Sequence, residues 1–334
     1  MLRPMADSPL ISARLLRTLC LGAMAAVATG STAQVTRPES PLRIIVPLPA
    51  GATSDVLARI LVDALNSDFG RPVIVENRPG ASGQIAVQAL RRSAPDGGTV
   101  LLAPVAVPVL IPLVSPDVQY DPQRDLVPIA QVATFDYGFA VAPDHPAHDV
   151  EQFVAWAKAN PARATYGSPS SGSVPHLLGA MLAREAGIDF AHVPYRSAAA
   201  AESDVMGGRL AAVMSALSDM TSFYRVGKLR ILATPGTHRS PLTPDVPTFR
   251  EQGFAAVEAI GWHAMFAPAK TPQAAIDKLN AAVARALPDP AVAERMRMLG
   301  LEPHASTPAE LTALVKSETD RWRSIVKDAA ITPD

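Results

Sequence analysis

Three segments of the chain combine glycine or hydroxyl residues with the start of an expected helix. Residues 49–55 read PAGATSD, residues 168–173 read SPSSGS, and residues 196–197 (RS) precede an alanine-rich stretch. Unpaired backbone N–H groups and the positive end of the helix dipole favour an anion at such helix starts. Hydroxyl side chains add further donors for a carboxylate. The pattern therefore predicts binding of a small anion with no cofactor and no metal ion.

Several of these residues also have ordinary structural interpretations. Asp55 would repel an anion if it faced one, so we expect it to act as a helix cap and to point away from the ligand. His176 fits a capping or supporting role better than that of a base, with ligand contact as an alternative. Arg196 could balance a ligand carboxylate or could be a solvated loop residue. From the sequence alone, residues 49–55 could also be a plain turn between a strand and a helix.

Spacings typical of catalysis are missing from the sequence. A nucleophile elbow needs glycines two residues before and after a serine, and residues 167–173 do not provide them. His145 and His148 lie close together, but no second ligand pair accompanies them. We therefore predict a protein that is not an enzyme and that has no catalytic residues.

A repeated strand–turn–helix pattern positions the anion-binding segments. It is clearest at residues 42–65, where a buried strand is followed by a proline- and glycine-containing turn and a helix that could stop at Gly70. Ser173 is a good helix N-cap for the second segment. Strands that alternate with helices predict an α/β fold with sheets covered on both faces. Other strands are expected at residues 72–77, 99–103, 127–133, 137–142, 164–167, 190–195, 210–216, 229–234 and 261–268, and other helices at 84–92, 150–159, 198–208, 274–287, 291–299 and 308–328.

The N-terminus has the features of a secretory signal peptide. Arginines at positions 3, 14 and 17 precede a short apolar core at residues 18–29, and Ser31 and Ala33 are small residues before a possible cut at Gln34. We expect residues 1–33, including Cys20, to be removed and the mature chain to lie in the periplasm. A formal net charge of −1 and 5% aromatic residues give no support for a nucleic-acid partner.

Motifs along nearly the whole chain resemble the Bug family, the TctC-like extracytoplasmic solute receptors of tripartite tricarboxylate transporters. The matching segments are PLPAGATSDVLARIL, VENRPGASG, YDPQRDLVPIAQVA, TYGSPSSGSVPHL, HVPYR, GGRL, GKLRILAT, PDVPTFREQGF and GWHAMFAPAKTP. The resemblance implies a two-lobed periplasmic binding fold of the type II kind, with a mostly parallel sheet flanked by helices in each lobe and two crossovers between the lobes. We place lobe 1 at residues 34–139 and 237–334, and lobe 2 at residues 140–236.

The resemblance also implies a function. The lobes would close on a small organic acid or acidic amino acid, which a monomeric receptor would deliver to the permease subunits of the transporter. A receptor that presents its closed form to a membrane signalling protein is the alternative, and a secreted hydrolase is a weaker one.

In the family, the first loop and the YGS loop hold one carboxylate through backbone N–H groups, hydroxyls and water. Carried over to this chain, that role falls to Pro49, Ala50, Gly51, Ser168, Ser170 and Ser173, with Tyr195 and Ser197 in a third loop. Ala52, Ser54, Pro169, His176 and Arg196 complete the predicted ligand-binding set.

Three of these positions depart from the family pattern. Ala52, Ser170 and Ser197 stand where glycine is usual. We therefore expect a shifted ligand preference and a less adaptable first loop.

Overall fold

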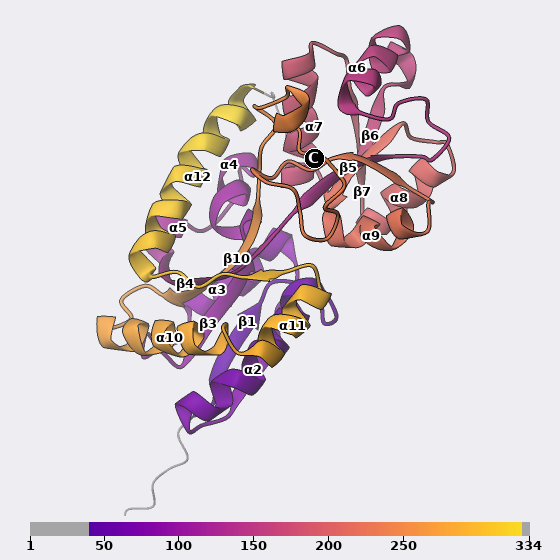
Figure 1. Ribbon diagram of the computed structural model, residues 1–334. Helices are drawn as coiled ribbons and strands as arrows, with labels where there is room; N and C mark the ends of the chain where they lie inside the picture. The colour runs from indigo at the N-terminus through magenta and orange to yellow at the C-terminus, as the bar shows by residue number, and fades with distance from the viewer. Residues whose placement is uncertain (1–39, 329–334) are drawn as a thin grey trace, which may run out of the picture. The chain divides into compact units, whose positions relative to one another are not determined.

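The computed structural model describes residues 40–328 of the 334-residue chain. The predicted signal peptide lies outside the described residues. Figure 1 shows the helices and strands of the described part, which contains two β-sheets.

The first sheet has six strands in the order β11-β4-β10-β3-β1-β2. β1 pairs in parallel with β2 and β3, while β10 is antiparallel to both β3 and β4, and β11 is antiparallel to β4. The strands are β1 (Leu42–Val46), β2 (Val73–Asn77), β3 (Thr99–Pro104), β4 (Leu126–Phe135), β10 (Gly261–Pro268) and β11 (Glu302–Pro303).

The second sheet has five strands in the order β7-β6-β8-β5-β9. β6 is parallel to β7 and β8, and β5 is antiparallel to β8 and β9. The strands are β5 (Tyr137–Val141), β6 (Thr165–Pro169), β7 (Ala191–Tyr195), β8 (Ala212–Ala216) and β9 (Arg230–Ala233). In each sheet four strands share one direction, so the predicted mostly parallel sheets are found as mixed sheets.

Helices cover both faces of the first sheet. Four of the five β1 residues are apolar, and they pack on both faces of the sheet: Ile44 lies in a core with Leu57 of α2, and Ile45 lies in a different core with Leu90 of α3. A strand covered by helices on both faces is mostly apolar, and Arg43 is the one charged residue of β1. The helices are α2 (Thr53–Phe69), α10 (Gln273–Ala286) and α11 (Pro290–Met298) on the Ile44 face, and α3 (Gln84–Arg91) and α12 (Pro308–Asp328) on the Ile45 face.

The second sheet is covered in the same way. Phe153 of α6 and Leu177 of α7 belong to the core that contains Phe139 of β5, while Val205 of α8 and Met220 of α9 belong to another. The helices are α6 (Val150–Ala159), α7 (Val174–Ala186), α8 (Ala198–Met206) and α9 (Leu217–Arg225). Short helical segments complete the chain: η1 (Ala81–Gly83), η2 (Ala106–Leu110), α4 (Ile111–Val114), α5 (Pro122–Asp125), η3 (Pro161–Arg163) and η4 (Arg250–Gln252).

The chain passes between the two sheets twice. It leaves the first sheet between β4 and β5, at Asp136, and returns between β9 and β10. Of the predicted lobe boundaries, 139–140 falls within β5 and 236–237 falls between β9 and β10. The expected α/β class, the two sheets with helices on both faces and the two crossings are confirmed.

Most predicted elements lie within a few residues of their expected places, and Gly70 ends α2 with φ 61°. The sequence patterns missed α9, β11 and the helical turns between residues 106 and 114. The last segment contains Pro108 and Pro112, and both residues are accommodated in short helical turns. Within residues 40–328, no helix is both long and apolar enough to span a membrane.

Candidate functional site

The β1–α2 loop (residues 47–52) leads into the first helix start. Ala52 is the N-cap of α2 and has ordinary extended backbone angles, with φ −68° and ψ 157°. Its methyl group accepts no hydrogen bond, so the polar contact at this helix start comes from further along the chain. Asp55 Oδ2 accepts a hydrogen bond from the Gly51 N–H at 2.9 Å.

The role of Asp55 differs in part from the prediction. We expected it to cap the helix and leave the Gly51 N–H to the ligand, but its carboxylate occupies that N–H itself. Asp55 is 2% exposed and also accepts from Arg59 Nε at 3.0 Å and from Asn77 Nδ2 at 3.0 Å. The hydrogen bond from Arg59 is the main cause of its lowered pKa, which the Gly51 and Asn77 contacts lower further and burial opposes. Asp55 is therefore a fixed anion that holds the loop.

Ser54 points into the protein rather than toward a ligand. Its side chain is fully buried, and Oγ lies 2.9 Å from Nε2 of His263 on β10. Burial lowers the pKa of His263 to about 4, so its imidazole is neutral at pH 7. The sequence analysis missed His263, although a lone histidine in the apolar segment GWHAMFAP could have drawn attention to it.

The β6–α7 loop (residues 170–173) forms the second helix start. Ser173 is the N-cap of α7, as predicted: its Oγ accepts from the His176 N–H at 3.4 Å and donates to the Ser170 carbonyl at 2.9 Å. His176 Nδ1 in turn accepts from the Gly172 N–H at 3.0 Å. Ser170 has φ 67°, a left-handed conformation that glycine adopts without steric cost.

Ser168 resembles Ser54 in its surroundings. It is fully buried, and its Oγ lies 2.7 Å from Nε2 of His192 on β7. The His192 ring stacks on that of His176, with 3.7 Å between ring centroids and 10° between the planes. The Ser168 hydroxyl is therefore bonded to His192 within the protein and helps to hold the β6–α7 loop in place.

The third predicted segment lies at the start of α8. Ser197 is the N-cap of this helix and accepts from the Ala200 N–H at 3.3 Å. Tyr195 donates its hydroxyl proton to Asp204 Oδ2 at 2.6 Å. Arg196 is exposed.

One cavity of about 460 Å³ is bordered by both of the first two loops. Pro49, Pro169, Ser170 and Ser173 of the predicted set line it, with Ser171 and Gly172 beside them. The opposite wall adds residues that the sequence analysis did not select, among them Ser82, Val107, Ile111, Val114 and Ser115. The other predicted ligand residues are not part of this lining: Ala50, Gly51, Ala52, Ser54, Ser168, His176, Tyr195, Arg196 and Ser197.

A larger and more highly charged cavity of about 1070 Å³ borders the start of α2 on another side. Thr53 lines this cavity together with residues of α9 and α11, and the lining includes Asp219, Arg225, Glu294 and Arg297. The first turn of α9, which contains Asp219 and directly follows β8, therefore also borders a cavity, and the sequence analysis missed this helix.

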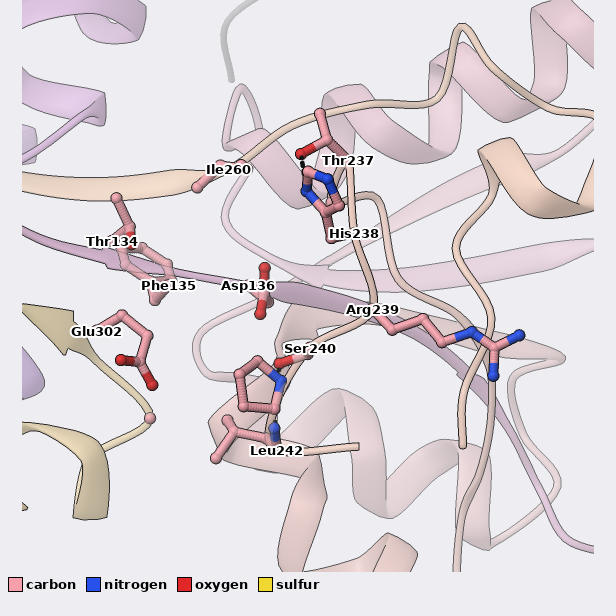
Figure 2. Close-up of a pocket in the computed structure, with 13 residues that line it drawn as sticks. Thr134, Phe135, Asp136, Thr237, His238, Arg239, Ser240, Leu242, Ile260 and Glu302 are labelled. Carbon is pink, nitrogen blue, oxygen red and sulfur yellow. Dashed lines mark hydrogen bonds between the residues drawn. The ribbon is translucent and has the colours of Figure 1, made fainter. Parts of the chain in front are cut away.

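A smaller cavity of about 190 Å³ lies where the chain crosses between the sheets (Figure 2). Asp136, between β4 and β5, lines it together with Ser240 and His238 from the returning segment and Glu302 of β11. Burial is the main cause of the raised pKa of Asp136; Glu302 raises it further, and a hydrogen bond with Ser240 opposes both. The contact between Asp136 and Ser240 joins the outgoing and returning chain segments.

The arrangement is suited to holding a ligand more than to bond chemistry. Ser54–His263 and Ser168–His192 have the spacing of a nucleophile and a base, yet both hydroxyls are fully buried and out of reach of a substrate. No group of three or more His, Cys, Asp or Glu side chains within residues 40–328 is arranged to hold a metal ion.

Comparison with known sequences gives consistent matches over most of the chain. A sequence model of the family described as "Tripartite tricarboxylate transporter family receptor" matches residues 57–331. The protein BugT of Bordetella pertussis is 32% identical over 294 residues, which cover 88% of this chain and 90% of BugT.

Comparison with solved structures gives the same result as comparison with sequences. The periplasmic binding protein BugD is 30% identical, with a TM-score of 0.75, over 89% of this chain and all of BugD. An R. palustris protein solved with adipate is 28% identical, with a TM-score of 0.79, over 89% of this chain and 100% of that protein. MatC of Rhodopseudomonas palustris, solved with malate, is 27% identical, with a TM-score of 0.75, over 86% of this chain and 99% of MatC.

Proposed function

Since the chain belongs to the tripartite tricarboxylate transporter receptor family, we propose that it captures a small carboxylate and delivers it to the permease subunits of such a transporter. The family consists of periplasmic receptors. The proposal includes export by a cleavable signal peptide at residues 1–33.

One observation carries this proposal. The β1–α2 loop and the β6–α7 loop, which belong to different sheets, border the same 460 Å³ cavity, and its lining includes Ser173, the N-cap of α7. Volumes of about 300–1,000 Å³ are usual for small-molecule sites. The start of α7 contributes a positive potential and backbone donors at the β6–α7 loop, which favours an anionic ligand there. Relatives of this chain have been solved with adipate and with malate, both dicarboxylates.

Ligand capture would work through the two chain crossings. A ligand that contacts loops from both sheets stabilises the arrangement in which those loops are close together, and so shifts the population toward the closed form. The short chain segments around Asp136 are the natural place for the backbone to adjust. We propose that the protein acts as a monomer, as a binding protein and not as an enzyme.

Thermal unfolding with a panel of organic acids and acidic amino acids tests the proposal. The protein should first be unfolded and refolded to remove any co-purified ligand. A binding carboxylate at 100 times its Kd raises the free energy of unfolding by about 2.7 kcal/mol. If no carboxylate in the panel raises the melting temperature, the proposed function is wrong.

A further inference from the structure

The 460 Å³ cavity has two chemically different walls. The wall from the second sheet is the β6–α7 loop, which presents three serines, Ser170, Ser171 and Ser173. The opposite wall, from the first sheet, is mostly hydrocarbon: Leu48, Val107, Ile111 and Val114 line it together with several prolines, and its polar side chains are Ser82 and Ser115.

Formal charge is missing from both walls. Among the residues that line this cavity in the described part of the chain, there is no Lys, Arg, His, Asp or Glu. The 1070 Å³ cavity nearby differs in this respect, because acidic and basic side chains both contribute to its lining.

These walls set a limit on the charge that a ligand can carry into the 460 Å³ cavity. One carboxylate can be placed at the serine wall, beside the start of α7 and its dipole. The rest of the ligand then lies against hydrocarbon, where apolar atoms gain from leaving water. A second carboxylate at that wall would be desolvated with no cation to balance it, which is costly.

Building on the proposed function, we infer that the preferred ligand is a monocarboxylate with an apolar body, and that Val107, Ile111 and Val114 select against a second charge. The serine wall holds the anionic end. The hydrocarbon wall recognises the aliphatic or aromatic remainder by contact and by excluding water.

Isothermal titration at pH 7.5 with ligand pairs of matched length tests this inference. Hexanoate is compared with adipate, and 4-ethylphenylacetate with 1,4-phenylenediacetate. We expect the monocarboxylate of each pair to bind at least tenfold more tightly. Equal affinity, or tighter binding of the dicarboxylates, would overturn the inference and leave the proposed function standing. Binding of no carboxylate, in these pairs or in the wider panel, would overturn both.

A variant pair locates the selectivity in the wall. Ile111 is only partly buried, so Ile111→Lys can place a cation at the cavity without deleting a core residue. It should lower the hexanoate-to-adipate affinity ratio at least tenfold. Val226→Lys, at a position that is 68% exposed after α9, adds the same charge away from the cavity and should leave the ratio unchanged. An unchanged ratio in Ile111→Lys would show that this wall does not select the ligand; if that variant fails to fold, the wild-type ligand pairs still decide the inference.

Discussion

The two loops that border the 460 Å³ cavity lead into helix starts that are built alike but capped differently. Each has a buried serine whose hydroxyl contacts a histidine Nε2: Ser54 with His263 and Ser168 with His192. The capping groups differ, however. At α2 the loop is held by a charged carboxylate, Asp55, whereas at α7 it is held by a neutral hydroxyl, Ser173.

The difference bears on where an anionic ligand could be bound. Asp55 places a negative charge close to the start of α2. Its carboxylate already accepts hydrogen bonds from Arg59 and from the Gly51 N–H. The neutral cap at α7 leaves the helix dipole without a neighbouring carboxylate at the serine wall. We therefore expect the α2 side to be the firmly built support and the α7 side to hold the carboxylate.

Replacing Asp55 should give the largest loss of stability. Asp55→Ala leaves the Gly51 N–H and the Asn77 amide without their acceptor and removes the partner of Arg59. We expect the free energy of unfolding to fall by about 3 kcal/mol, measured by urea denaturation. Asp68→Ala, in the same helix, removes a surface ion pair with Arg285 and should cost less than about 1 kcal/mol. Equal losses would contradict the role given to Asp55.

The buried His263 should make the α2 side sensitive to acid. Its pKa in the folded protein is about 4, below the ordinary 6.5, so the unfolded chain binds a proton that the folded protein excludes between these pH values. Its contribution to stability is present above pH 6.5 and falls as the pH drops toward 4. Between pH 7.5 and pH 5 the loss should be about 2 kcal/mol. His263→Gln should lose correspondingly less over the same interval; parallel pH profiles would contradict the assignment.

Removing the neutral cap at α7 should have a smaller effect. Ser173→Ala deletes the acceptor for the His176 N–H and the donor to Ser170. We expect a loss of about 1 kcal/mol in the free energy of unfolding. Because this cap borders the cavity, the affinity for a bound carboxylate should also fall. A variant with lower stability but unchanged affinity would show that the serine wall does not hold the ligand.

The smallest expected effects concern Ala52 and Ser170, two of the three positions at which a family glycine is replaced. Ser170→Gly removes a side chain from a residue with φ 67° and should stabilise the protein by about 1 kcal/mol or less. Ala52→Gly should bring no such gain, because φ −68° suits any residue. The sequence predicts that Ala52→Gly broadens ligand choice by loosening the β1–α2 loop. Equal melting temperatures for the two variants, or an unchanged ligand range in Ala52→Gly, would contradict these expectations.

Local patterns predicted much of this molecule. The apolar run at β1, the stop at Gly70 and the N-cap at Ser173 each depend on neighbouring residues and on backbone geometry, which are legible in the sequence. The family resemblance added the two-sheet fold, because the order of matching motifs along the chain carries topology that local propensity does not.

The candidate site was only partly predictable. Pro49, Pro169, Ser170 and Ser173 border the 460 Å³ cavity, but Ser54 and Ser168 have the same residue type and point into the protein. Their histidine partners are 209 and 24 residues away in the sequence. No local pattern could therefore show which serine hydroxyls are hydrogen-bonded within the protein.

By itself, then, the sequence determined where strands end and helices begin, and hence where positive helix ends and hydroxyls occur. Only the tertiary structure decided which of those groups are buried or hydrogen-bonded within the protein and which remain open to a ligand. Long-range contacts bury Ser54 on His263, bring Val107, Ile111 and Val114 opposite the serines, and leave Asp55 bonded to the Gly51 N–H that the sequence had assigned to the ligand. Hydrogen bonding and burial are properties of positions in space, and residues far apart in the chain become neighbours only when the two sheets form.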